Sequence, residues 1–350
     1  MKKNINVSRR KSVKHRNSTR VVVVLAVILL ICGLLAGMAA LMAYKTYHGK
    51  EVELEISPEM SAERVKDMMI DQLGEDYGIT LYRVWNFRSG DVDKAVGHYV
   101  VKPGDRVWSV ANRLKAGAQT PVKVTFNNIR LMEDLARVVA SKMNFSADDF
   151  IRACDKELTA IGYKREEYPA AFIPDTYEFY VTESAEKVVR TLVDYRDKFW
   201  NGERVAKAEK RGLTPIGVMT LASIVEEESS KTDERQIIAG LYLNRLKRGM
   251  KLQADPTVKF ALGDFSIRRV LNKHLEVESP YNTYKYEGLP PGPIRIVEKA
   301  TIDAVLDAPE VEYLYMCARE DFSGYHNFTD DYNVHLANAR RYQAKLDSQK

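Results

Sequence analysis

The residues best suited to chemistry are three consecutive glutamates, Glu226, Glu227 and Glu228, which end the apolar run "TPIGVMTLASIV". At helical spacing this run forms one broad apolar arc. Glu226 falls within that arc, Glu228 falls on its far side and Glu227 falls in the middle of the polar face. Burial among apolar groups raises the pKa of a carboxyl, because it destabilises the anion. A carboxylic acid still protonated near neutral pH can protonate the leaving oxygen in glycosidic-bond cleavage.

A structural interpretation of Glu226 competes with the catalytic one. The next predicted helix carries arginines that could form an ion pair with it, namely Arg235, Arg245 and Arg248. Three later segments favour catalysis: "NRLKRGMKLQADPTV", "SPYNTYKYEGLPPGPI" and "GYHNFTDDYNVH". They combine aromatic rings for stacking with amide, hydroxyl and carboxylate groups that can bind sugar hydroxyls. This mixture is typical of a sugar-binding groove.

The same segments resemble the endolytic murein transglycosylases of the MltG/YceG-like family. The shared motifs are "FIPDTYEF", "LASIVEEE", "GMKLQADPTV", "YNTY…GLPPGPI" and "HNFT", and the resemblance covers nearly the whole chain. It implies that Glu226 is the catalytic glutamate. It also implies cleavage of the MurNAc–GlcNAc bond within glycan strands, without water, to leave 1,6-anhydro-MurNAc ends and so terminate nascent strand elongation.

A mechanism with one carboxyl follows from this resemblance. Glu226 would protonate the glycosidic oxygen and then take the proton of the sugar's own 6-hydroxyl as that oxygen attacks C1. We expect substrate contacts, or contacts that orient Glu226, from four loop residues, Gln253, Asp255, Asn282 and Tyr284. Asp255 is also a candidate helper carboxylate. Asp175 and Glu178 of "FIPDTYEF" are weaker candidates for substrate binding, since either could cap a turn.

Two positions depart from the family pattern. Ala170 and Ala171 stand where the family commonly has Glu-Gly, which would change a wall of the groove. Glu227 stands where the family commonly has Lys or Arg. We expect the second departure to matter little, because residue 227 is predicted to face solvent.

Two other functions compete with the lytic enzyme. One is a non-catalytic glycan-binding scaffold of the cell-wall machinery. The other is a hydrolytic muramidase in which Asp255 or Glu228 activates water. No metal or other cofactor is expected, because the histidines lack ligand spacing. A serine hydrolase is disfavoured because the chain has no GxSxG motif.

The N-terminal region predicts a membrane anchor. Residues 21–43 are uncharged and mostly apolar, which is long enough to cross a bilayer. The run exceeds a signal-peptide core, which favours an uncleaved single-pass span over a signal peptide. Eight cations precede the run and two follow it, so we expect a basic cytoplasmic tail, 1–20, and an extracytoplasmic catalytic domain on the plasma (inner) membrane.

The charge distribution argues against nucleic acid as a partner. Of the 53 Lys and Arg, ten lie in residues 1–50, which contain no acid. The remaining 43 face 48 acids, so residues 51–350 carry a net charge of −5. The expected partners are peptidoglycan glycan strands and the membrane, with peptidoglycan synthases implied only by the resemblance.

The predicted fold class is α+β: a small LysM-like module, 50–145, precedes a mostly helical catalytic domain with long loops, 146–350. Segments starting at Val52, His98 and Val122 each read as strand, turn and helix. The second segment, "YVVKPGDRVWSVANRL", resembles the start of a LysM module, in which Trp108 would either stack on a sugar or belong to the core. Cys154 and Cys317 are read as free thiols or as one long-range disulfide.

Overall fold

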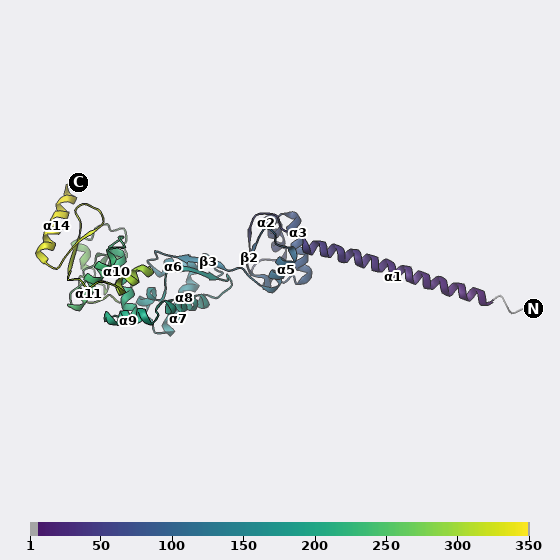
Figure 1. Ribbon diagram of the computed structural model, residues 1–350, viewed down its shortest axis with the longest axis horizontal. Helices are drawn as coiled ribbons and strands as arrows, with labels where there is room; N and C mark the ends of the chain where they lie inside the picture. Colours follow the sequence, from purple (N-terminus) through teal and green to yellow (C-terminus); the bar gives the residue numbers. More distant parts are fainter. Residues whose placement is uncertain (1–5, 349–350) are drawn as a thin grey trace, which may run out of the picture. The chain divides into compact units, whose positions relative to one another are not determined.

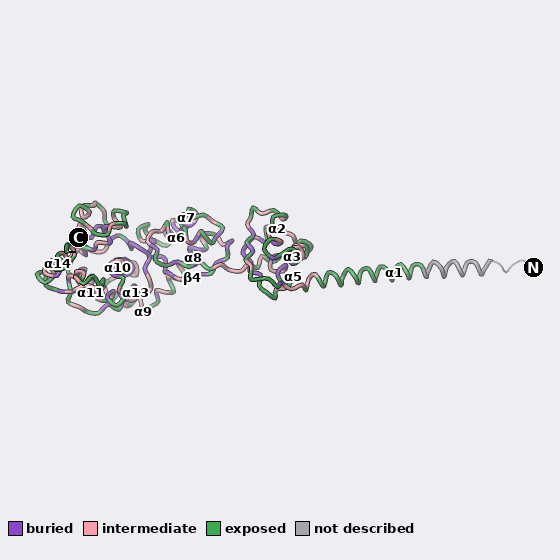
Figure 2. The backbone as a smooth tube through the Cα atoms, turned by 90° about the horizontal axis from the view of Figure 1, so that it is seen from above, coloured by how far each residue is buried: buried purple, intermediate pink, exposed green. Residues whose placement is uncertain are grey.

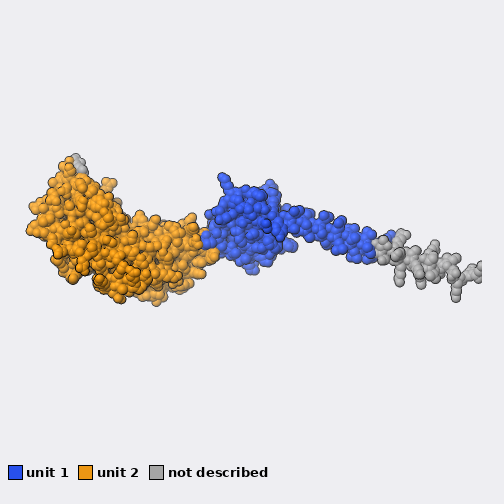
Figure 3. Space-filling view, viewed as in Figure 1, with its two compact units in different colours: residues 1–121 blue, residues 122–350 orange. Residues whose placement is uncertain are grey.

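The computed structural model describes residues 6–348 and divides into two compact units, with the boundary between Pro121 and Val122 (Figure 3). The sequence analysis places a domain boundary at 145/146. The structure differs because strand β3, Val122–Phe126, pairs antiparallel with β4, Asp175–Phe179. The third strand–turn–helix segment therefore belongs to the second unit.

Unit 1 begins with one long helix, α1, Asn6–Tyr44 (Figure 1). Its part Arg20–Tyr44 is long and apolar enough to cross a membrane, and its side chains are mostly exposed (Figure 2). This agrees with the predicted span. Residues 1–5 of the predicted basic tail lie outside the described residues.

A small two-stranded module follows α1. Strands β1, Val52–Ile56, and β2, Gly97–Val101, pair antiparallel, and α2, Ala62–Leu73, α3, Glu75–Arg88, and α4, Val92–Ala95, connect them. Helix α5, Val107–Ala116, follows β2. Alternating strand residues and helical apolar stripes meet in one core that includes Leu54, Met69, Trp85 and Tyr99. The predicted strand–turn–helix order is confirmed here, and the LysM resemblance stays a prediction.

Unit 2 opens with the β3–β4 pair covered by helices. These are α6, Met132–Ala140, α7, Ala147–Ala160, the 3₁₀ helix η1, Arg165–Ala171, and α8, Ala185–Phe199. The polar pattern of residues 184–211 predicts one long helix that ends at Gly212, but the structure has a separate helix, α9, Gly202–Lys210, after α8. The break arises because the Asn201 side chain accepts a hydrogen bond from the Arg204 amide and so starts a new helix.

The rest of unit 2 is built around α10, Pro215–Glu228, which packs against α11, Arg235–Lys247, and α13, Lys299–Leu306. Residues 250–295 are rich in Gly, Pro, Asn and Tyr, a composition that predicts long loops. They contain α12, Asp255–Leu262, and the 3₁₀ helix η2, Asn272–Glu276, and are otherwise irregular. A hairpin of β5, Tyr315–Ala318, and β6, His326–Thr329, precedes α14, Tyr332–Asp347. The mixture of many helices with short antiparallel strands confirms a helix-rich α+β fold.

The two external cysteines are both free. Cys154 is buried in the core of the β3–β4 region, whereas Cys317 lies in β5. The alanine pair that departs from the family pattern, Ala170 and Ala171, is completely buried in core. Neither alanine is therefore exposed at a groove surface, and any effect of this departure on a groove wall stays a prediction.

Candidate active site

Helix α10 is a central helix rather than a surface one. It starts where the Thr214 hydroxyl accepts a hydrogen bond from the Gly217 amide, with Pro215 in its first turn. Residues 218–226 are all buried. Its polar Ser223 is satisfied, because the hydroxyl donates to the Thr220 carbonyl and accepts from the Ile294 amide. The helix thus buries Glu226 and leaves Glu227 and Glu228 half-buried at its end.

Glu226 is buried among cations and donors rather than among apolar groups. Its Oε1 lies 3.0 Å from the Arg295 Nε, and its Oε2 lies 3.9 Å from the Arg235 Nη1. Oε2 also accepts hydrogen bonds from the Thr301 hydroxyl at 2.6 Å and the Glu298 amide at 3.1 Å. These contacts stabilise a carboxylate. The expected apolar surroundings are wrong, and the competing ion-pair interpretation is confirmed for Arg235.

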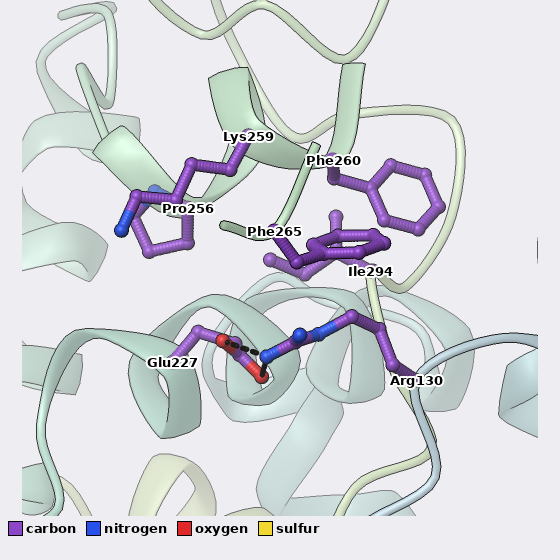
Figure 4. Close-up of a pocket in the computed structure, with 7 residues that line it drawn as sticks. All are labelled: Arg130, Glu227, Pro256, Lys259, Phe260, Phe265 and Ile294. Atoms are coloured by element: carbon purple, nitrogen blue, oxygen red, sulfur yellow. Dashed lines mark hydrogen bonds and ion pairs between the residues drawn. The ribbon is translucent and has the colours of Figure 1, made fainter. Parts of the chain in front are cut away.

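Glu227 was predicted to face open solvent, but the structure places its carboxylate against two arginines. Its carboxylate accepts two hydrogen bonds from Arg130, at 2.8 and 2.9 Å, and one from Arg295 at 2.6 Å. Figure 4 shows this pair beside Phe265, over which the Arg130 guanidinium lies 4.4 Å from the ring centre. Arg295 therefore bridges Glu226 and Glu227, and both glutamates are held by arginines.

Glu228 has quite different surroundings. Among the described residues no cation lies within ion-pair distance of its carboxyl, and its Oε1 accepts a hydrogen bond from the Tyr242 hydroxyl at 2.7 Å. Burial raises the pKa of Glu228 to about 7, and the charge of Asp255 adds to the rise. A raised pKa was predicted for Glu226, and the structure gives one to Glu228, two positions later.

Glu228 opens into a pocket of about 450 Å³, within the range of ligand sites, roughly 300–1,000 Å³. The pocket is lined by α11, the start of α12, the β5–β6 hairpin and α14. Its polar and aromatic lining residues are Glu228, Tyr242, Arg245, Gln253, Asp255, Tyr284, Tyr315, His326, Tyr332 and His335. Several aromatic rings beside carboxyl, amide and guanidinium groups suit a carbohydrate.

Three of the predicted substrate residues meet in this pocket. The Tyr284 hydroxyl donates to Asp255 Oδ1 at 2.7 Å, and burial together with the Asp255 carboxylate raises the pKa of Tyr284. Gln253 adopts a left-handed backbone conformation, φ 52°, which is unusual for this residue and occurs often at functional sites. Its side-chain oxygen accepts from Arg245 at 3.3 Å.

Asn282 does not join them. It is fully buried, and its amide nitrogen donates to the carbonyls of Leu275 and Val277 while its oxygen accepts from the Tyr284 amide. The predicted direct contact of Asn282 with substrate stays a prediction, and the hydrogen bonds within the protein favour an orienting role. Asn282 fixes the loop that carries Tyr284.

Asp175 and Glu178 lie on β4 and do not line the pocket. Asp175 accepts hydrogen bonds from Lys299 and Tyr195, which hold its pKa down at about 2. Glu178 is exposed and stands opposite Lys123 in the strand pair. Their positions therefore favour a structural role for Asp175 in joining β4, α8 and α13, and leave Glu178 at the surface.

Sequence reasoning missed several pocket residues. His326 and His335 were dismissed as metal ligands, yet both line the pocket. The His326 Nδ1 lies 2.9 Å from Glu234, and burial with the nearby Arg245 charge lowers the pKa of His335. The segment "GYHNFTDDYNVH" was a signal for these two residues. Tyr242 carried no such signal, because it lies in an ordinary helical pattern.

The described part of the chain is a helix-rich α+β fold with one candidate membrane span and a polar and aromatic pocket beside Glu228. A model of the YceG-like family matches residues 54–341. The chain belongs to the YceG-like family.

Curated relatives carry an activity in their names. A protein named "Endolytic murein transglycosylase" from Bacillus subtilis (strain 168) is 29% identical over 244 residues, which cover 64% of this chain and 67% of the relative. A protein of the same name from Streptococcus pneumoniae serotype 2 (strain D39) is 29% identical over 181 residues. That match covers 50% of this chain but 32% of the pneumococcal protein, so the chain spans about a third of its length.

A solved structure supports the fold. The crystal structure of a yceG-like protein from Listeria monocytogenes aligns with a TM-score of 0.55 at 24% identity. The alignment covers 82% of this chain and 98% of the listerial chain. At this identity the likeness concerns the fold alone.

Proposed function

We propose that this chain is an endolytic murein transglycosylase that acts on peptidoglycan glycan strands from a single membrane anchor. The chain is an enzyme of the lytic transglycosylase class, as its family and its curated relatives indicate. The single observation that carries the chemistry is Glu228: a carboxyl with a pKa of about 7 that opens into a 450 Å³ polar pocket.

The proposal gives Glu228 the role of general acid. Near neutral pH a large fraction of this carboxyl keeps its proton, which it can donate to the glycosidic oxygen between MurNAc and GlcNAc. The resulting carboxylate then accepts the proton of the 6-hydroxyl of MurNAc while that oxygen attacks C1. The product is a 1,6-anhydro-MurNAc end, and water takes no part. The assignment of this role to Glu226 stays a prediction from resemblance, and its arginine contacts argue against it.

The other pocket residues position the carboxyl and the sugar. The Tyr242 hydrogen bond fixes the orientation of Glu228, and the Asp255 charge favours the protonated form. Asp255, itself held by Tyr284, also offers a negative charge to an oxocarbenium-like centre. Gln253, Tyr315 and Tyr332 supply amide and ring surfaces for substrate.

The anchoring proposed here has the N-terminus in the cytoplasm, with the catalytic unit outside the plasma membrane. The charge asymmetry around Arg20–Tyr44 supports it. Cleavage of strands at this location would terminate the elongation of nascent glycan, next to the synthases that make it.

The test is product analysis. The full chain is incubated with purified, uncrosslinked glycan strands, and the released fragments are measured by mass spectrometry. We expect internal fragments with anhydro ends. Fragments with reducing ends would show a hydrolytic muramidase, and intact strands that nevertheless bind the protein would show a glycan-binding scaffold. Either result overturns the proposal.

A further inference from the structure

One face of α3 in unit 1 lies beside the end of the candidate span. Asp76, Thr80, Arg83 and Phe87 are spaced by four, three and four residues, so they form a single stripe on this helix. The opposite face, with Tyr77, Leu81 and Trp85, is buried in the module core. Asp76, Thr80 and Arg83 line one side of a hollow of about 740 Å³, and residues 37–45 of the chain line the other.

Several contacts hold α3 and α5 against the end of α1. Lys45 forms an ion pair with Asp76 at the start of α3. The Val107 amide at the start of α5 donates to the Lys45 carbonyl at 2.9 Å. The backbones of Thr46 and Arg106 form an isolated antiparallel β-bridge. The Arg106 guanidinium lies 5.5 Å from the centre of the Tyr44 ring. If Tyr44 marks the end of the span, these helices lie at the surface of the bilayer that α1 crosses.

The residues at this position combine exposed aromatic rings with unpaired cations. Phe87 is 93% exposed and Trp108 is 44% exposed, although Trp85 of the same unit is fully buried. The Arg88 guanidinium lies 3.8 Å from the centre of the Trp108 ring. Within the described part of the chain, Arg83, Arg88 and Arg106 have no carboxylate at ion-pair distance, in contrast to Arg113, which pairs with Asp105.

Such a combination suits the headgroup region of a membrane. Aromatic rings favour the interface, where an apolar body meets a polar boundary. Arginines bind phosphate through two parallel hydrogen bonds, and anionic lipids attract cations that lie near the surface. Phe87, at 93%, has the largest exposed fraction of the large hydrophobic side chains in the described part of the chain.

We propose that Arg83, Phe87, Arg88, Arg106 and Trp108, here called the headgroup patch, bind the headgroups of anionic phospholipids in the bilayer that anchors the chain. The arginines contact lipid phosphates, and the two rings lie at the headgroup–acyl boundary. The patch thereby holds the module against the membrane surface. This inference rests on the proposed membrane anchoring, and it assigns Trp108 to lipid rather than to a sugar.

Trp108 is itself a reporter, because the other two tryptophans, Trp85 and Trp200, are buried. The full chain is reconstituted into vesicles of phosphatidylglycerol and phosphatidylcholine, with acyl chains brominated near the headgroup to quench tryptophan fluorescence. We expect quenching that is lost in Trp108→Phe and kept in the matched control Trp200→Phe. Equal quenching in all three proteins overturns the proposal.

The charge of the patch has its own test. We expect quenching of Trp108 to be at least about two-fold stronger in vesicles with phosphatidylglycerol than in pure phosphatidylcholine, because cations add attraction to an anionic surface. The triple variant Arg83→Gln, Arg88→Gln, Arg106→Gln should lose that difference. A difference that survives in the triple variant overturns the role of the arginines.

Two further outcomes separate this inference from the function above. A chain that alkaline carbonate extracts from the vesicles is not anchored, which overturns the anchoring and the patch together. A chain that stays anchored, shows no Trp108 quenching and changes its Trp108 emission on addition of purified glycan strands overturns the patch alone. In that case Trp108 serves a glycan site.

Discussion

The last turn of α10 presents the same side chain in two contrasting environments. Glu226 and Glu227 share Arg295, and each has a second arginine nearby. Glu228, one residue later, has a tyrosine hydroxyl and a pocket. Arginines stabilise a carboxylate, whereas burial beside Asp255 favours the neutral acid. The neighbours, and not the residue type, therefore give Glu228 a raised pKa.

The arginine-paired glutamates and Glu228 also differ in which parts of the fold they connect. The arginine-paired glutamates join distant parts of unit 2: Arg130 precedes α6, while Arg295 and Thr301 lie at or near α13. Among the described residues, Glu228 has no arginine partner, and its carboxyl accepts a hydrogen bond from Tyr242. We therefore expect substitutions at Glu226 to affect stability first, and substitutions at Glu228 to affect activity first.

The largest expected effect is on activity at Glu228. Glu228→Gln keeps size and the oxygen that accepts from Tyr242 but cannot donate a proton to a leaving oxygen. Loss of general acid–base catalysis should lower the rate of strand cleavage by about 10²–10⁴. The assay is release of fragments from purified glycan strands. Glu226→Gln, assayed at a temperature where it is folded, should retain most of its rate; the opposite order of activities would return the catalytic role to Glu226.

The second effect is on stability at Glu226. Glu226→Gln leaves Arg235 and Arg295 with one anion fewer in a buried site, and breaking such a pair costs about 3 kcal/mol or more of unfolding free energy. A carboxyl with apolar neighbours, as predicted from the sequence, could be replaced by an amide without such a loss. Chemical denaturation measures it. A double variant with Arg295→Gln should lose less than the two single variants together, and simple additivity would argue against direct coupling.

A third effect is the pH dependence that Glu228 gives to folding. Its folded pKa of about 7 lies above the ordinary value of 4.5, so the protonated form is favoured by folding. Its stabilising contribution is present below about pH 4.5 and is lost as the pH rises through 7. Glu228→Gln should therefore gain stability relative to the wild type across this window, by on the order of 2 kcal/mol at pH 8. A constant difference between pH 4 and 8 would contradict the raised pKa.

Much of the fold could be predicted because it follows from local pattern. Strand–turn–helix order, the span, α10, α11 and α14 all appear in periodicity and turn residues. The break at Asn201 was missed because one capping hydrogen bond ended an otherwise continuous polar helix. The domain boundary was missed because β3 pairs with β4 far along the chain: the first register pair, Val122 with Phe179, is 57 residues apart, and the last, Phe126 with Asp175, is 49 apart.

The candidate site could be predicted only in part. Asp255, Gln253 and Tyr284 were found because their segments concentrate polar and aromatic types on loops. The choice between Glu226 and Glu228 could not be made from the helical wheel. A helical wheel gives the direction of each side chain but not its neighbours. The decisive neighbours are Arg295, 69 residues after Glu226, and Tyr242, 14 residues after Glu228.

The smallest expected effect concerns Asp175, which the sequence analysis considered for substrate binding. Its pKa of about 2 reflects Lys299 and Tyr195, so its contribution to stability is present above the ordinary value of 3.8 and is lost as the pH falls towards 2. Since the side chain is 34% exposed, solvent screening reduces the value of the pair. Asp175→Asn should therefore cost about 1 kcal/mol at pH 7 and leave the rate of strand cleavage close to wild type. Glu178→Gln, on the same strand but exposed, is the matched control and should change neither stability nor rate. Thermal melts between pH 2 and 7 measure the first effect, and fragment release measures the second. A loss of cleavage rate in a folded Asp175→Asn protein would bring β4 into the active site and weaken the contrast drawn here between the arginine-paired carboxylates and the pocket.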